Sequence, residues 1–200
     1  MQSTTMAAAA APEQSLTSSE IAQANLHLDQ SSNGVIGALA GLSDSRWSFK
    51  PAPDVWSIAE ITEHIAFVQE RVLGLLRDQL PAAPPPPGRD HQAIDRIVIG
   101  QFPNRLRKFP APPALHPTAV SELADALHRV KANTETFRAT LAATPDLRRH
   151  ALESAPLKAI TQGEHQFMDG YQWILAASAH TERHTKQMLE VKAHPQFPTA

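Results

Sequence analysis

The chain has 200 residues, of which 42% are hydrophobic, a length and composition typical of one globular domain with its own core. Its formal net charge is −2, its Lys and Arg residues are dispersed, and it holds no run of 18 apolar residues. We therefore expect neither nucleic-acid binding nor a membrane span. The absence of cysteine excludes disulfides, thiolate metal sites and a cysteine nucleophile, and fits a cytoplasmic protein.

Residues 1–15 contain an alanine run but neither the basic start nor the long apolar core of a signal peptide. We predict a disordered leader there and a single domain over residues 16–200. The first helix of that domain begins at or directly after Thr17, because Thr17 and Glu20 have the spacing of a capping box. Its apolar positions continue to about Leu42.

A second helix follows, and Ser57 is its predicted N-cap because Glu60 completes another capping box. Isoleucine, valine and leucine recur at helical spacing from here to about Leu80. His64 lies beside this apolar stripe. Trp56, directly before the cap, either closes the start of the helix by apolar contact or lines a pocket.

The composition changes over residues 81–117, which hold 10 of the 17 prolines. No long helix can pass through such a segment, although a short helix over residues 92–100 is expected. A connection of this length usually crosses a domain or lines a site. It contains a small basic cluster of Arg105, Arg107 and Lys108, which either binds an anionic substrate or, as we expect, is solvated.

A third long helix is predicted to open at Thr118 and to stop before Pro145. Residues 146–168 have no clear periodicity, and we expect an irregular segment with one short turn near residues 147–152. The fourth long helix covers residues 170–191.

No strand-like alternation of any length is present. Four long amphipathic helices in one domain predict an all-α fold, a four-helix bundle with a long Pro-rich crossover between its second and third helices.

Two histidines on the fourth helix mark the candidate site. His180 and His184 lie one turn apart on a stripe where a bundle helix usually carries leucine or isoleucine. Burying their ring nitrogens without a partner costs roughly 1–3 kcal/mol each. A metal ion is one such partner, with His64 as a third ligand and an open position whose water is acidified. The alternative is that these histidines border the core and bond to carboxylates or backbone carbonyls.

Other polar residues are candidates for supporting roles. Glu60, one turn before His64, could orient a ligand ring or take a proton from the bound water. Arg183 and Gln187 lie near enough in sequence to donate hydrogen bonds around the site. The remaining histidines share no spacing and are expected at the surface: His27, His91, His116, His128, His150, His165 and His194.

Two stretches of the chain resemble the DinB/YfiT-like metalloenzyme superfamily: VWSIAEITEHIAFVQERV (residues 55–72) and YQWILAASAHTERHTKQML (residues 171–189). In that family W-S-x-x-E-x-x-x-H opens the second helix, and H-x-x-x-H followed by Q lies on the last. The matching residues are Trp56, Ser57, Glu60, His64, His180, Arg183, His184 and Gln187. The segment NRLRKFPAPPALHPT also resembles the crossover of one subgroup.

The resemblance implies a DinB-like four-helix bundle, often dimeric, with His64, His180 and His184 as ligands of a divalent ion. Nickel or zinc is the expected ion, with iron or manganese as alternatives. The implied activity is metal-dependent hydrolysis, or transfer of a low-molecular-weight thiol such as bacillithiol to a small-molecule substrate. Some relatives isomerise maleylpyruvate with mycothiol. The competing interpretations are a bundle that binds metal or a small ligand without turnover, and an interaction module with structural histidines.

Overall fold

The computed structural model describes residues 15–84, 88–106, 113–117 and 120–199, so the leader expected at residues 1–15 lies almost wholly outside the described residues. The expected mostly helical fold is confirmed. Four long helices dominate it: α1 (Ser18–Leu39), α3 (Ile58–Asp78), α5 (Leu123–Ala143) and α7 (Gly170–Lys192). The shorter elements are α2 (Asp44–Trp47), η1 (Leu80–Ala82), α4 (His91–Gln101), η2 (Pro113–Leu115), β1 (Ala151–Glu153), α6 (Ala155–Ile160) and β2 (Phe167–Asp169). Within the described ranges, no helix is both long and apolar enough to cross a membrane.

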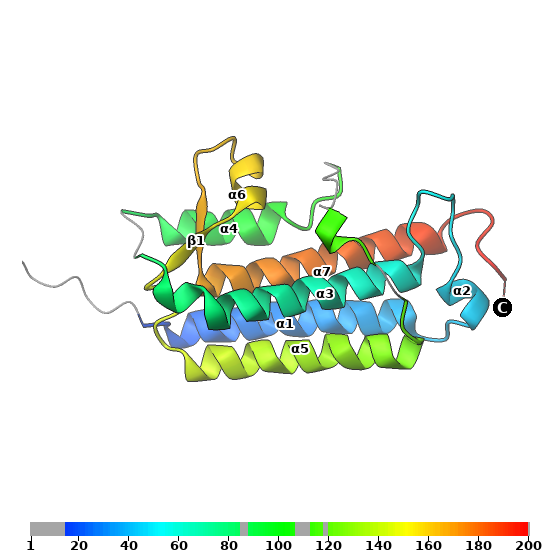
Figure 1. The fold of residues 1–200 in the computed structure, drawn as a ribbon, viewed down its shortest axis with the longest axis horizontal. Coiled ribbons are helices and arrows are strands. Elements are labelled where there is room, and N and C mark those ends of the chain that lie inside the picture. Colours follow the sequence, from blue (N-terminus) through cyan, green and yellow to red (C-terminus); the bar gives the residue numbers. More distant parts are fainter. Residues whose placement is uncertain (1–14, 85–87, 107–112, 118–119, 200) are drawn as a thin grey trace, which may run out of the picture.

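The long helices lie side by side (Figure 1), and each packs against two of the others. Helices α1 and α7 run in one direction, whereas α3 and α5 run in the opposite one. Their apolar faces enclose the core, whose largest fully buried side chains include Tyr171, Phe137, Ile58, Ile61, Ile65, Leu141 and Ile174. Helix α4, which confirms the short helix expected over residues 92–100, packs on α7 and adds Ile94 and Val98 to this core.

The capping boxes predicted at Thr17 and Ser57 are both present, and they start α1 and α3 where the sequence places them. Helix α1 ends at Leu39, earlier than expected, because Ala40 is extended and Gly41 takes a positive φ of 67°. Such a φ is readily adopted only by glycine, and it ends the helix.

Helix α5 begins at Leu123, so its predicted start at Thr118 was wrong, although Thr118 itself lies outside the described residues. The N-cap is Glu122. Trp47 Nε1 donates to the carbonyl of Ser121 at 3.3 Å. The Ser121 carbonyl, just before α5, therefore accepts a hydrogen bond from a distant side chain and not from an amide one turn further along the helix.

The segment expected to be irregular, residues 146–168, contains regular structure. Strands β1 and β2 pair antiparallel, with Leu152 opposite Met168, and α6 lies between them. Each strand has three residues, which is too short for an alternating pattern to be recognised in the sequence. The predicted short turn precedes β1. It is closed by the Arg149 amide, which donates to the carbonyl of Asp146.

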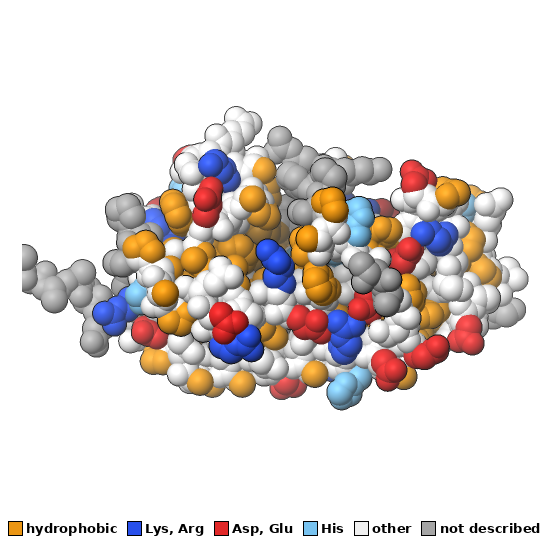
Figure 2. Space-filling view, in the orientation of Figure 1, with side chains coloured by type: hydrophobic (Ala, Val, Ile, Leu, Met, Phe, Trp, Pro, Cys, Tyr) orange, Lys and Arg blue, Asp and Glu red, His pale blue; other side chains and the backbone are white. Residues whose placement is uncertain are grey.

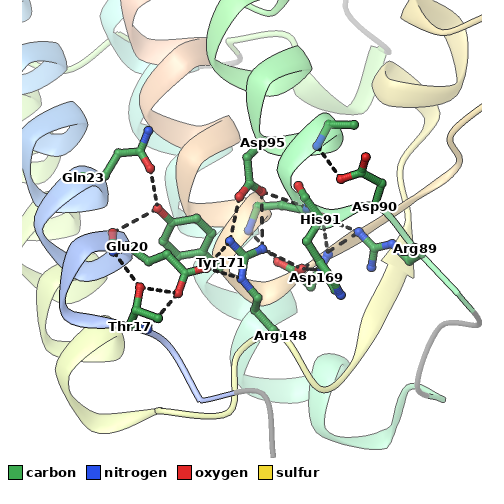
Figure 3. Close-up of polar contacts among 12 residues, drawn as sticks. Thr17, Glu20, Gln23, Arg89, Asp90, His91, Asp95, Arg148, Asp169 and Tyr171 are labelled. Carbon is green, nitrogen blue, oxygen red and sulfur yellow. Dashed lines mark hydrogen bonds and ion pairs between the residues drawn. The ribbon is translucent and has the colours of Figure 1, made fainter. Parts of the chain in front are cut away.

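A buried ion cluster, made by Arg148 with Glu20, Asp95 and Asp169, ties this segment to the long helices (Figure 3). The guanidinium donates to Glu20 at 2.7 Å, to Asp95 at 2.6 Å and to Asp169 at 3.1 Å. It also lies 4.3 Å from the centre of the Tyr171 ring. The cluster therefore joins α1, α4 and the start of α7 through one side chain that is 6% exposed.

We expect Arg148→Met to lower the free energy of unfolding by about 3–5 kcal/mol, because Glu20 and Asp95 lose their counter-ion and the fully buried Asp169 keeps only Arg89 and His91 as ion-pair partners among the described residues. Urea denaturation measures the change. Arg138→Met is the matched control, since the half-buried Arg138 also pairs with carboxylates across two helices, and about 1 kcal/mol or less is expected there. Equal losses in the two variants would contradict the role given to burial.

Candidate metal centre

The packing of α3 against α7 brings together the three histidines singled out in the sequence. His64 comes from the first half of α3, and His180 and His184 from the middle of the oppositely directed α7. The Nε2 atoms of His64 and His180 are 3.2 Å apart. One ligand nitrogen from each residue lies within 4.8 Å of the other two, so this group could hold a metal ion.

Burial keeps these rings neutral. His64 is 3% exposed and His184 is 9% exposed. Burial lowers the pKa of His64, and it lowers the pKa of His180 still further, with the nearby His184 and His64 adding to the effect. Burial and the proximity of His64 lower the pKa of His184 to about 3. A neutral imidazole keeps one nitrogen lone pair, which is what a metal ligand requires.

Outer hydrogen bonds fix which nitrogen carries the proton in two of the rings. His64 Nδ1 donates to the carbonyl of Leu115 at 2.8 Å. His184 Nδ1 contacts Gln187 Oε1 at 2.9 Å, and that oxygen also accepts from Arg105 Nη1 at 3.2 Å. With the proton on Nδ1, the Nε2 lone pair of each ring is available for a ligand.

The distance between the facing nitrogens fits a shared ion. Two imidazole nitrogens, each about 2.0–2.1 Å from one ion, are about 2.9 Å apart at a right angle and about 3.4 Å apart at a tetrahedral angle. The observed 3.2 Å between His64 and His180 lies within that interval. His180 Nδ1 is buried and has no hydrogen-bond partner in the described chain. The residues present therefore fit a divalent ion held by three neutral nitrogens.

The structure places Glu60 in the capping box of α3. Its carboxylate accepts from the Ser57 amide at 2.8 Å and from Lys50 Nζ at 2.9 Å. Burial acts to raise the pKa of Glu60, but the bonds from Ser57 and Lys50 outweigh it, and the pKa is lowered. Its predicted role as an orienting group or base stays a prediction, and both carboxylate oxygens already have partners.

Aromatic side chains adjoin the histidines. The ring centre of Trp56 is 4.9 Å from that of His64, and it is 5.7 Å from the exposed ring of His116. Trp56 also packs against the core cluster that contains Ile58 and Ile61. The apolar contact that the sequence predicts for Trp56 at the helix start is therefore present, and its role in lining a pocket stays a prediction.

Two contacts of the site were not predicted from the sequence. The carbonyl of Leu115 belongs to the backbone, so no residue type signals it. Arg105 was expected to be solvated, but it forms a two-pronged ion pair with Glu190 and bonds to Gln187. The other members of its basic cluster, Arg107 and Lys108, lie outside the described residues.

Two expected donors act differently in the structure. Gln187 accepts hydrogen bonds from His184 and Arg105 through its amide oxygen. Arg183 donates to the carbonyl of Asn104, in the loop after α4, and so contacts that loop.

On the face shown in Figure 2, the surface is hollowed between the lobe of α4 and α6 and the η2 turn. Hydrophobic side chains lie on the floor of this hollow. The carbonyl of Leu115 in η2, at one border of this hollow, is the one that contacts His64.

Known proteins resemble most of this chain. The profile of the DinB superfamily matches residues 27–188, a range that contains all three histidines. An uncharacterized protein of Bacillus subtilis (strain 168), YuaE, is 27% identical over 155 residues, which cover 77% of this chain and 88% of the relative. No solved structure matches the chain significantly.

We expect the metal-free protein to lose stability as the pH falls below 6.5. The unfolded histidines take up protons near 6.5, whereas folded His184 does so only near 3, so acid favours the unfolded state. Each pH unit in that window costs about 1.4 kcal/mol for one such histidine. Urea midpoints in the presence of a chelator at pH 7.5 and pH 5 measure the loss.

The His184→Leu variant lacks one of the titrating groups. Between pH 6.5 and pH 5 its free energy of unfolding should fall by about 2 kcal/mol less than that of the wild type. An equal loss in both proteins would show that His184 protonates normally in the folded state.

Proposed function

Because the chain belongs to the DinB superfamily, we propose that it is a metal-dependent enzyme whose divalent ion is held by His64, His180 and His184. The observation that carries the proposal is the convergence of three neutral imidazoles, with ligand nitrogens within 4.8 Å of one another. Imidazole ligands suit nickel and zinc, and they also accept iron or manganese.

The proposal includes the DinB-like four-helix bundle, with residues 81–117 as its Pro-rich crossover. Helices α3 and α5 run in the same direction, so the chain has to return along the molecule between them. The contact of Leu115 with His64 supports a crossover that also borders the site.

A divalent ion in this position would lower the pKa of a water or thiol that it binds. The chain contributes three neutral ligands and no cysteine, so any thiol would have to come from a small molecule. Burial and the proximity of His64 lower the pKa of His184, and the positive charges of Arg105 and Arg183 add to the effect, so the ring stays neutral and able to bind an ion. We therefore propose hydrolysis, or transfer of a low-molecular-weight thiol, on a small-molecule substrate.

We further propose a homodimer in the cytoplasm, as the resemblance to the family implies. Sedimentation analysis of the metal-loaded protein measures the assembly.

Untagged protein purified without added metal or chelator should contain close to one divalent ion per chain, and His184→Ala should contain almost none. Elemental analysis provides the measurement. His128→Ala is the control, because His128 is exposed on α5 and belongs to no ligand group found in the described residues. If the wild type takes up none of nickel, zinc, iron or manganese, the histidines are structural and the proposal fails.

Cobalt-loaded protein tests for an open position on the ion. We expect added 2-mercaptoethanol to produce a thiolate-to-cobalt charge-transfer band in the near-ultraviolet, and His180→Ala, with one ligand fewer, to bind little cobalt and show no band. A fully ligated ion would give the same spectrum with and without the thiol. That result would favour a protein that binds metal without turnover.

A further inference from the structure

We infer that Arg105 is a positioning residue for the metal centre, because it fixes the orientation of the Gln187 amide and, through it, the tautomer of His184. The inference rests on the proposed metal site. It adds a residue from the loop after α4, far in sequence from all three histidines, to the groups that shape this site.

Arg105 is firmly anchored on α7. Its Nε and Nη2 donate to the two carboxylate oxygens of Glu190, each at 2.6 Å. This fork leaves Nη1 directed at Gln187 Oε1, 3.2 Å away. The Arg105 side chain is only 18% exposed, whereas that of Glu190 is 57% exposed, so the pair is shielded from water on the arginine side.

A guanidinium can only donate hydrogen bonds, and this limits how the Gln187 amide can lie. The oxygen and the NH₂ group of an amide have nearly the same shape, and rotation about the last side-chain bond exchanges them. Only the oxygen can face Arg105 Nη1, because an NH₂ group there would set two donors against each other.

The orientation of the amide determines the proton position on His184. The same Gln187 oxygen lies 2.9 Å from His184 Nδ1, so that nitrogen has to carry the hydrogen. The lone pair is then on Nε2 and available to a metal ion. Without Arg105 the amide can rotate and present its NH₂ group, which favours the tautomer with hydrogen on Nε2, and that nitrogen cannot then be a ligand.

His184 differs in this respect from the other two ligands. The Nδ1 of His64 faces the carbonyl of Leu115, a backbone group that cannot exchange acceptor for donor. The Nδ1 of His180 has no partner in the described chain. Among the three rings, His184 alone depends on a side chain whose polarity can reverse, and Arg105 prevents that reversal.

The first test measures zinc affinity by competition with a chromophoric chelator. We expect Arg105→Met and Gln187→Met each to weaken zinc binding roughly tenfold, as is usual for groups that orient a metal ligand. Arg138→Met is the matched control, because Arg138 also bonds to an amide oxygen (Asn25) and to carboxylates, but between α5 and α1. The control should bind zinc as the wild type does.

Two further variants separate amide orientation from charge. A carboxylate offers an oxygen to both neighbours, so Gln187→Glu needs no guanidinium to orient it. We expect Arg105→Met to weaken zinc binding in the wild type but not in the Gln187→Glu background. Arg105→Met should also add nothing to Gln187→Met, since both act through the same oxygen.

Long-range ¹H–¹⁵N spectra of the metal-free protein report the tautomer directly. We expect His184 to carry hydrogen on Nδ1 in the wild type and to show a mixture of tautomers in Arg105→Met. Wild-type zinc affinity together with an unchanged tautomer in Arg105→Met would overturn the inference. If His184→Ala also binds zinc normally, the proposed metal site fails as well, so the two failures are distinguishable.

Discussion

Helices α3 and α5 run in the same direction, and much of the molecule depends on this constraint. A chain that leaves α3 at Asp78 has to travel back before α5 can begin at Leu123, and α4, between the two in the sequence, packs on α7. The loop after α4 and the η2 turn lie on that return path. They supply the carbonyl of Leu115, which accepts from His64, and Arg105, which donates to the Gln187 oxygen beside His184.

Two buried polar groups, one at the start of α7 and one near its middle, differ in their electrostatics. At the start of the helix, Arg148 and its carboxylates place full charges in contact, so removing one partner leaves others uncompensated. Near the middle of the helix, His180 and His184 are uncharged, because burial keeps their rings unprotonated. The charged cluster therefore tolerates the loss of a partner poorly, whereas the neutral histidines keep nitrogen lone pairs available to a ligand.

Features that repeat along the chain could be predicted, and those that depend on a single distant contact could not. The long helices and two capping boxes follow from apolar periodicity and local spacing, as does the one-turn separation of His180 and His184. Strands of three residues carry no readable period, and the start of α5 depends on Trp47 reaching Ser121. The third capping box, of Asp169 with Gln172, was visible in principle but lies where no regular structure was expected.

The contact between His64 and Leu115 has a consequence for how such a chain can evolve. A backbone carbonyl is present whatever side chain occupies position 115, so many substitutions there preserve the hydrogen bond. Insertions and deletions are different, because they shift which carbonyl arrives above the ring. Selection here acts on the length and course of the segment more than on its amino-acid sequence. Related chains can therefore retain the contact after their sequences have diverged.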